Sequence, residues 1–326
     1  MNKTALITGA NGQDASYLAE FLIQKNYKVH GTIRRNSVPE SQTTRIDHLR
    51  SEESIELHYM DLTDTISVDS VMKKTQPDEI YHLAAQSHVQ ISFELPKYTL
   101  DVNGGGTLAI LESTRRFSPK TKIYHAATSE MFGNSCDIDG FQRENTPLCP
   151  VSPYGCSKLY AHSLCRNYRN AYKMFICSGI LFNHESPRRG INFVTNKTVL
   201  EAVKIKLGLS DKLVLGNLES ERDWGHAKDY VEAMWLMMQQ DVSSDFVIAT
   251  GETRTVKEMV EYVFHKLNLD WTKYTQTDKK FERPEELNYL RGDPAKAKKV
   301  LNWNPKYTFK TMMDEMIDYW MKILQG

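Results

Sequence analysis

The sequence predicts an α/β fold, a Rossmann-type doubly wound parallel sheet with a smaller, mostly C-terminal lobe. Three observations predict it. Short β-branched runs alternate with amphipathic helical patterns in the first half of the chain, a glycine-rich turn follows the first run, and glycine and proline interrupt the less regular second half. Strand–helix alternation implies parallel pairing through right-handed crossovers.

The predicted strands are short apolar runs. They cover residues 4–8, 29–33, 55–60, 80–84, 123–126, 175–181 and 246–249. Apolar residues at helical spacing predict helices after the first strand and at 69–74, 108–117, 256–267 and 311–323. We expect the last strands to interleave with the second lobe.

Composition narrows the class of protein. The 326 residues include 41 basic and 41 acidic side chains, a balance that argues against a nucleic-acid binder. No apolar run approaches the roughly 18 residues of a membrane span, and no signal peptide is visible, so we expect a cytoplasmic protein. The five cysteines form no C-x-x-C pair. They predict buried or half-buried free thiols, without a disulfide framework or a metal site.

The turn after the first strand has the pattern of a dinucleotide-binding site. Gly9 and Gly12 allow the backbone to approach a pyrophosphate at a helix N-terminus, and Ala15 occupies the place of the third glycine. An ordinary strand-to-helix turn is the alternative. The position of the motif at the first strand favours the dinucleotide.

The end of the second strand favours NADP over NAD. An NAD enzyme places an acidic residue there, whereas this chain has Arg34 and Arg35. An arginine can pair with a ribose 2′-phosphate, although a solvated basic turn is the alternative. Asp61-Leu62 and the segment 83–87 follow the next two strands, where ligands of open α/β sheets bind.

A tyrosine and a lysine four residues apart carry the strongest catalytic signal. In Ser152-Pro153-Tyr154-Gly155-Cys156-Ser157-Lys158, proline suits the first turn of a helix, so Tyr154 and Lys158 share one face. A nearby ammonium is expected to lower the tyrosine pKa, so that the phenolate can accept a proton from a hydroxyl. A chance pair on a helix surface is the alternative.

The fifth strand ends in Thr128-Ser129-Glu130. A simple alcohol dehydrogenase of this architecture needs a hydroxyl here but no carboxylate. Glu130 can remove an acidified proton next to a carbonyl and assist the loss of a hydroxyl. A salt-bridged glutamate at a strand end is the alternative.

Together these segments resemble a known family. The motifs T-G-x-x-G-Q-D, L-A-A-Q-S-H-V, T-S-E-M-F-G, S-P-Y-G-x-S-K, L-F-N-H-E-S-P-R-R-G and R-D-W-G-H-A-K-D-Y are similar to those of GDP-mannose 4,6-dehydratases, extended short-chain dehydrogenase/reductases. The resemblance runs from residue 4 to about residue 305. It implies conversion of GDP-mannose to GDP-4-keto-6-deoxymannose by C4 oxidation, loss of water across C5 and C6, and return of the hydride to C6.

The resemblance also assigns residues. Catalysis would use Thr128, Glu130, Tyr154 and Lys158. The NADP contacts would be Gly9, Asn11, Gly12, Gln13, Asp14, Arg34, Asp61, Leu62, Leu83, Ala85, Gln86, Ser87, Tyr98, Lys158, His184 and Arg189. The GDP-sugar contacts would be Asn183, Lys197, Arg222, Arg283 and Glu286.

The resemblance divides the chain into two parts. Residues 1–182, completed by segments within about 226–254, would bind NADP, and residues 183–225 and 255–326 would bind the nucleotide sugar. We expect a homodimer or homotetramer, although the loop 36–44 departs from the family's serine-rich version. Asn196 stands where an arginine is typical. GDP-manno-heptose therefore stays an alternative substrate.

Two further functions remain open. An NADPH-dependent 4-keto sugar reductase of the same fold would use Thr128, Tyr154 and Lys158 without needing Glu130. A nonenzymatic dinucleotide sensor would need none of the four.

Overall fold

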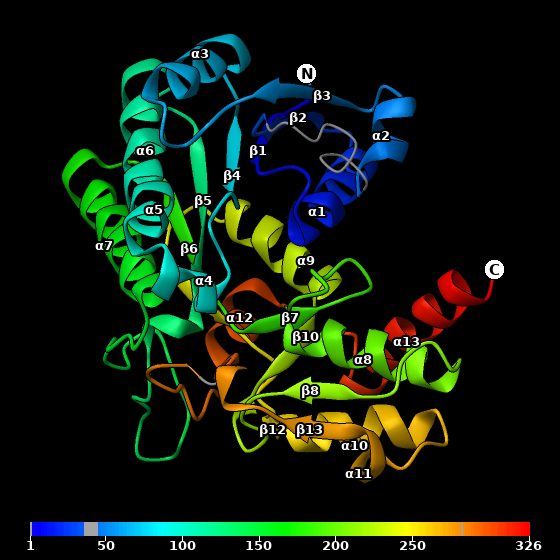
Figure 1. Cartoon of the computed structure of the whole chain (residues 1–326). Coiled ribbons are helices and arrows are strands. Elements are labelled where there is room, and N and C mark those ends of the chain that lie inside the picture. Colours follow the sequence, from blue (N-terminus) through cyan, green and yellow to red (C-terminus); the bar gives the residue numbers. More distant parts are fainter. Residues whose placement is uncertain (1, 36–44, 282) are drawn as a thin grey trace.

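The computed structural model describes residues 2–35, 45–281 and 283–326. A seven-stranded parallel sheet forms its larger lobe (Figure 1). The order is β11-β6-β5-β4-β1-β2-β3, and all pairs are parallel. The strands are β1 (Thr4–Thr8), β2 (Lys28–Ile33), β3 (Ile55–Tyr59), β4 (Glu79–His82), β5 (Lys122–Thr128), β6 (Ile176–Leu181) and β11 (Asp245–Ile248). The predicted doubly wound sheet is confirmed, with strand ends shifted by up to two residues.

Helices cover both faces of this sheet. One face carries α1 (Gln13–Gln24), α9 (Ala227–Met238) and α12 (Ala295–Leu301). The other carries α3 (Thr65–Thr75), α6 (Gly106–Phe117) and α7 (Pro153–Tyr172). Shorter helices α2 (Asp47–Ser51), α4 (Val89–Glu94) and α5 (Pro96–Leu100) and the π-helix η2 (Asp101–Gly105) lie in the connections. Two buried apolar clusters result, one on each face of the sheet.

The start of α7 follows directly from its sequence. Pro153 occupies the first turn, where a missing N–H costs nothing, and Ser152 Oγ accepts a hydrogen bond of 3.0 Å from the Gly155 amide. The helix then runs for 20 residues along the sheet. Tyr154 and Lys158 are thereby fixed at the carboxyl end of β5.

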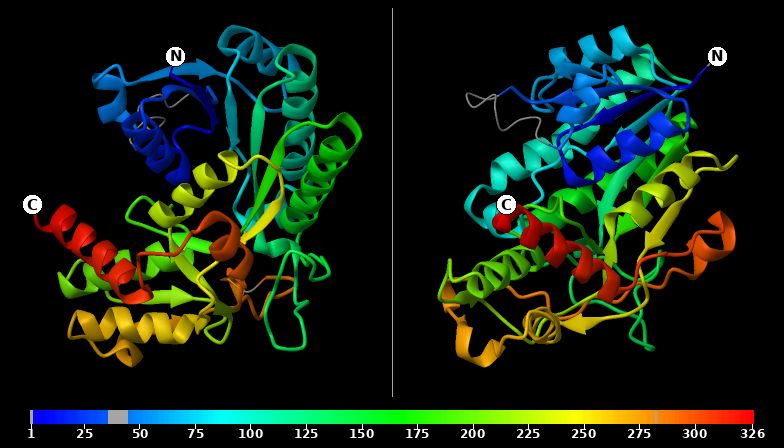
Figure 2. Two further views of the ribbon diagram at one scale, coloured as in Figure 1. Left: turned by 180° about the vertical axis from the view of Figure 1, so that it is seen from behind. Right: turned by 90° about the vertical axis from the view of Figure 1, so that its right-hand side faces the viewer.

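A second lobe lies beneath the carboxyl ends of the strands (Figures 1 and 2). Its core joins α8 (Val194–Lys206), α10 (Val256–Lys266) and α13 (Phe309–Gln325). Short strand pairs frame it: β7 (Asn183–Glu185) with β10 (Trp224–His226), β8 (Leu213–Leu215) with β13 (Thr275–Thr277), and β9 (Glu221–Arg222) with β12 (Arg254–Thr255). The short elements α11 (Trp271–Tyr274) and η4 (Lys279–Phe281) also belong to this part of the chain. The short 3-10 helix η3 (Ser129–Met131) instead follows β5 directly. The proposed boundaries at 182, 226 and 254 stay predictions.

The register places the functional ends of the strands at one edge. Thr8 at the end of β1 pairs with Thr32 and with His82, and Thr128 at the end of β5 pairs with Leu181. The loops that leave these strands therefore meet at the carboxyl edge of the sheet and face the second lobe. In the described ranges, no helix has the length and apolar character required to cross a membrane.

Candidate active site

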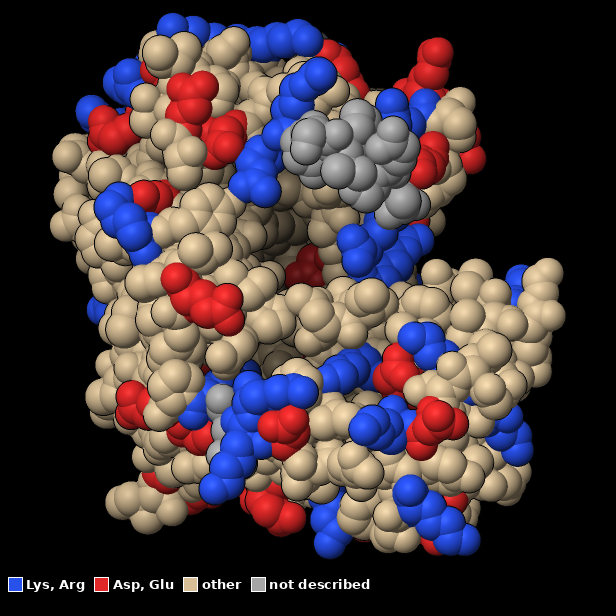
Figure 3. Space-filling view, viewed as in Figure 1, with Lys and Arg blue, Asp and Glu red and all other residues tan. Residues whose placement is uncertain are grey.

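A cleft of about 1140 Å³ lies between the carboxyl ends of the strands and the second lobe. Figure 3 shows it as a hollow with lysine and arginine side chains on both sides. A cleft at this edge is where open α/β sheets bind their ligands.

The glycine turn shapes one end of the cleft. Gly9 has φ +72°, and a Cβ there would lie 3.0 Å from Ala84 Cα. A side chain is therefore excluded both by the backbone conformation and by the neighbouring strand. Gly12 then caps α1 without a side-chain hydrogen bond from the described residues. The first amides of α1 can receive a pyrophosphate, so these residues fit a dinucleotide.

An ion pair between Asp14 and His184 lines the cleft beside this turn. His184 Nε2 lies 2.7 Å from Asp14 Oδ2, and Gln13 Nε2 donates to the His184 carbonyl oxygen at 3.1 Å. Burial disfavours both charged forms, but the attraction between the two groups outweighs it. The pKa of His184 is raised and that of Asp14 is lowered. The pair fixes β7 against the start of α1.

The adenosine end of the predicted dinucleotide site carries Arg34, whose Nη1 donates to the hydroxyl of Tyr98. Both residues line the cleft, as do Asp61 and Leu62 after β3. Arg35 instead lies over the ring of Tyr59, 5.6 Å from its centroid, and is not among the lining residues. The two neighbouring arginines thus differ in their access to a ligand. The loop 36–44, whose sequence departs from the family pattern, lies outside the described residues.

The four predicted catalytic residues converge on the middle of the cleft. Thr128 Oγ1 accepts from the Glu130 amide at 3.2 Å. Lys158 Nζ donates to the Ala126 carbonyl oxygen at 2.9 Å. β5, η3 and the first turns of α7 therefore place a hydroxyl, a carboxylate, a phenol and an amine around one space.

The expected effect of Lys158 on Tyr154 is wrong for this structure. Burial raises the pKa of Tyr154 to about 12, although the nearby Thr128 side chain opposes this shift. Burial also lowers the pKa of Lys158 to about 8, because it disfavours the charged ammonium form. In this site burial, and not the charge of Lys158, is the largest influence on the pKa of Tyr154.

The carboxylate of Glu130 is nearly buried, with 11% of its side chain exposed. Its Oε1 receives Arg283 Nη1 at 3.2 Å. Its Oε2 is buried and has no hydrogen-bond partner among the residues that the structure describes. A buried acceptor without a partner is costly, which suits an oxygen that a ligand would satisfy.

Basic groups from the second lobe face Glu130 across the cleft. Arg222 is buried, and burial together with the nearby Arg283 lowers its pKa to about 10. Glu286 Oε1 accepts from the Arg283 amide at 2.8 Å and so shapes the loop that carries Arg283. Lys197 Nζ donates to the Val214 carbonyl oxygen at 2.7 Å. Three cations on one wall can hold an anionic ligand such as a diphosphate.

With one exception, the residues predicted to form the site line this cleft, Asn183, Ala85 and Arg189 included. The exception is Gln86, whose side chain accepts from the His88 amide at 2.7 Å and donates to Thr99 Oγ1 at 3.0 Å. It supports the loop after β4. The predicted thiol environments were partly wrong, because Cys136, Cys149 and Cys156 are exposed.

The cleft also contains residues that the sequence analysis did not single out. They come from α4, from the loop before α8 and from the segment after β8: His88, Gln90, Glu94, Asn192, Phe193, Thr195, Gly216, Asn217 and Ser220. His88 belonged to a recognised motif. The others have no local signature, because the packing of α4 and of the second lobe around the sheet edge places them in the cleft.

Comparison with known proteins identifies the family of this chain. The family model described as GDP-mannose 4,6 dehydratase matches residues 6–316. The chain belongs to this family. GDP-mannose 4,6 dehydratase 2 of Arabidopsis thaliana is 50% identical over 326 residues, covering 97% of this chain and 86% of that protein. The predicted family resemblance is confirmed.

Solved structures share the fold of this GDP-mannose 4,6-dehydratase family member. UDP-glucose 4-epimerase of Thermotoga maritima, solved with UDP-glucose, has a TM-score of 0.87 at 21% identity, covering 98% of this chain and 99% of that one. RMD of Pseudomonas aeruginosa, solved with NADPH, has a TM-score of 0.81 at 21% identity and covers 99% of both chains. At these identities the likeness concerns the fold alone.

Proposed function

We propose that the protein is an NADP-dependent lyase that converts GDP-mannose to GDP-4-keto-6-deoxymannose. The observation that carries the proposal is the position of Glu130. Its carboxylate lines the same cleft as Thr128, Tyr154 and Lys158. An enzyme that only oxidises or reduces C4 does not need this carboxylate, whereas one that eliminates water does. Family membership supports the same activity.

The preference for NADP rests on the end of β2. Arg34 lines the cleft near the glycine turn, and no acidic residue occupies positions 31–35. An exposed guanidinium favours a 2′-phosphate and an acidic side chain would favour a free ribose hydroxyl. When bound, the nicotinamide nucleotide would accept the hydride of C4 and return it to C6.

Side chains of the protein would accept and donate the protons of the reaction. Tyr154, in its phenolate form, would accept the C4 hydroxyl proton as the C4 hydride leaves, which gives a ketone. The ketone acidifies the C5 proton, and Glu130 would remove it. The same proton on Glu130 can then leave with the C6 hydroxyl as water. Hydride addition at C6 and a solvent-derived proton at C5, balanced by release of the Tyr154 proton to solvent, complete the 4-keto-6-deoxy sugar without net oxidation.

The second lobe would bind the GDP moiety. Arg222, Arg283 and Lys197 would pair with the diphosphate, while Asn183 and Glu286 would offer hydrogen bonds. Association into a homodimer or homotetramer stays a prediction.

The argument for a heptose substrate rests on Asn196, and the structure weakens it. Asn196 is fully buried. Its amide donates to the Arg189 carbonyl oxygen at 2.6 Å and accepts from Trp320 Nε1 at 2.7 Å. It does not line the cleft. The residue links α8 to α13 outside the cleft, so its identity is no argument for a heptose.

The test is incubation of the protein, loaded with NADP⁺, with GDP-mannose and no reductant. We expect the 4-keto product to form with catalytic amounts of cofactor. Glu130→Gln should form no product yet still oxidise C4, which a single-turnover rise in NADPH absorbance would show. Glu285→Gln, an exposed change in the loop that holds Arg283, is the matched control and should keep normal turnover. A wild-type protein that needs stoichiometric NADPH would instead be a reductase.

A further inference from the structure

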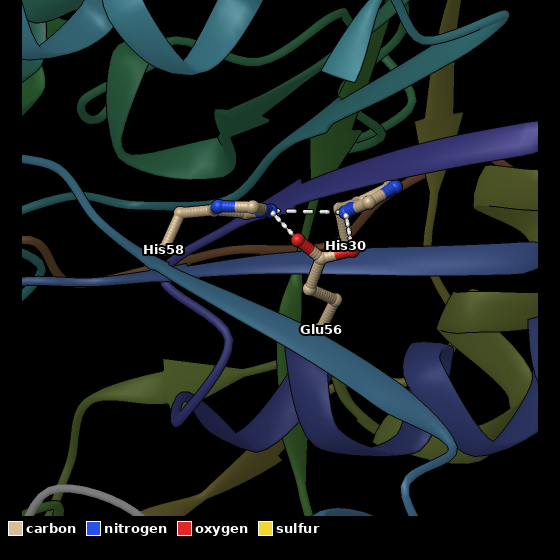
Figure 4. A group of neighbouring side chains, drawn as sticks. All are labelled: His30, Glu56 and His58. Atoms are coloured by element: carbon tan, nitrogen blue, oxygen red, sulfur yellow. Dashed lines mark hydrogen bonds and ion pairs between the residues drawn. The ribbon is translucent and has the colours of Figure 1, made fainter. Parts of the chain in front are cut away.

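A cluster of two histidines and a glutamate lies outside the cleft, at the edge of the sheet (Figure 4). His30 belongs to β2, and Glu56 and His58 belong to the outermost strand β3. In the parallel register His30 is opposite Glu56 and Thr32 is opposite His58. Residues two apart on a strand share a face, so all three side chains project toward the side of the sheet covered by α3.

The three groups present their ligand atoms to one point. His30 Nδ1 lies 2.9 Å from His58 Nε2. Glu56 places Oε2 3.5 Å from His30 Nδ1 and Oε1 3.7 Å from His58 Nε2. A tetrahedral zinc ion with bonds of about 2.0–2.1 Å separates its ligand atoms by about 3.3 Å. Shifts of a few tenths of an ångström would therefore convert this triangle into one face of a zinc site.

The donor types also suit a transition metal. Both histidines are buried. A neutral imidazole has a free lone pair, and it binds zinc, copper or nickel rather than magnesium or calcium. Glu56 is 44% exposed, which gives an ion access from solvent.

Lys74 contacts Glu56 Oε1, one of the proposed ligand atoms, and the other ring nitrogen of His58. Its Nζ lies 3.0 Å from Glu56 Oε1 and 3.4 Å from His58 Nδ1. The ammonium is on α3 and 63% exposed, so it can move into solvent. Lysine and a divalent cation would compete for Glu56, and this competition separates a metal site from a simple hydrogen-bond network.

We propose that His30, Glu56 and His58 bind a divalent transition-metal ion of the zinc type, with water completing the coordination. The ion would connect β2 to β3 close to the strand ends that carry Arg34 and Asp61. Its role would be structural, because neither the ion nor its ligands line the cleft. The three ligands come together only through the pairing of β2 with β3, so no cysteine motif marks the site.

The test is calorimetric titration of the whole chain with Zn²⁺. We expect one site, and His58→Gln or Glu56→Gln should weaken Zn²⁺ binding at least ~10-fold, the smallest loss typical even of supporting residues. Glu56→Gln changes a half-exposed side chain and should leave the fold intact. The control is His48→Gln, which removes an exposed imidazole 2.8 Å from Glu20 and should not alter the affinity.

A second variant tests the competition directly. Lys74→Ala should tighten Zn²⁺ binding by at least about 5-fold, the effect of one screened charge roughly 4 Å away. A hydrogen-bond network without metal affinity would gain nothing. Co²⁺ provides the spectroscopic check, because thiolate charge-transfer bands would assign the ion to the exposed Cys136, Cys149 or Cys156. Such bands, or equal affinity in all variants, would overturn the proposal.

Discussion

The guanidinium of Arg283 lies 3.2 Å from the carboxylate of Glu130, although 153 residues separate them in the chain. The proposed base and a proposed diphosphate ligand are therefore paired in the protein without substrate. The contact keeps the carboxylate from being an unpaired buried charge. We infer that binding of the diphosphate would draw Arg283 toward the phosphates and release Glu130 for the sugar.

Loss of Arg283 should therefore weaken substrate binding. Arg283→Gln is expected to raise the KM for GDP-mannose roughly 10- to 100-fold, since a hydrogen bond to a charged group contributes about 1.5–3 kcal/mol. Steady-state kinetics measures this. Lys280→Gln, in the same segment but paired with Asp278, should leave KM unchanged. An unaltered KM in Arg283→Gln would remove this residue from the substrate site.

Arg34 and Arg35 offer a paired test of cofactor preference. Arg34→Gln should weaken NADP⁺ binding about 10- to 100-fold while NAD⁺ binding changes little, because the 2′-phosphate loses a charge-assisted hydrogen bond. Fluorescence titration gives both dissociation constants. Arg35→Gln should change neither, because Arg35 is stacked on Tyr59. Equal losses for both cofactors would show that Arg34 does not read the phosphate.

The buried charge of Lys158 should lower the free energy of unfolding at neutral pH. Its pKa is lowered from 10.5 to about 8 in the folded protein, chiefly by burial. The unfolded chain therefore binds more protons between pH 8 and 10.5, and stability should rise with pH there. The penalty at pH 7 is about 3 kcal/mol before any loss of hydrogen bonding.

The variant Lys158→Met removes that penalty. We expect a higher Tm than wild type at pH 7, a difference that shrinks from pH 8 to 10, and a loss of turnover. Thermal unfolding across this pH range is the measurement. A variant that is less stable than wild type at pH 7 would show that the contact with Ala126 matters more than desolvation.

Gly9→Ala should damage both the fold and the dinucleotide site. The positive φ of 72° costs a side-chain-bearing residue roughly 1–2 kcal/mol, and the added methyl would press on Ala84. Chemical denaturation should show the loss of stability, and titration should show weakened NADP⁺ binding. Gly208→Ala separates the two effects: its φ is also positive at 71°, but its Cβ would meet nothing within 4 Å, and it lies outside the cleft.

Local patterns predicted the parts of the site that are close in sequence. Gly9 with Gly12, and Tyr154 with Lys158, follow from strand-to-helix and helix geometry. The contact between Arg283 and Glu130 could not be predicted in this way, because it depends on how the second lobe closes on the sheet. The family resemblance placed both residues in the site but did not pair them.

Effects that depend on burial and strand pairing could not be predicted from the sequence either. The expected lowering of the Tyr154 pKa considered only the nearby ammonium of Lys158, whereas burial raises that pKa. The histidine–glutamate cluster depends on the register between β2 and β3, and neither strand shows it alone. The cofactor assignment of Gln86 stays a prediction, and its side-chain amide hydrogen-bonds within the segment after β4.

The most direct measurement is the isotope content of the product made in D₂O from unlabelled GDP-mannose without added reductant. Elimination through Glu130 exchanges the C5 proton with solvent while the C4 hydride moves to C6. We therefore predict one solvent deuterium at C5 and the original C4 hydrogen at C6, detected by NMR and mass spectrometry. A 4-keto product that retains hydrogen at C5, or that carries solvent deuterium at C6 in place of the transferred hydride, would contradict the mechanism.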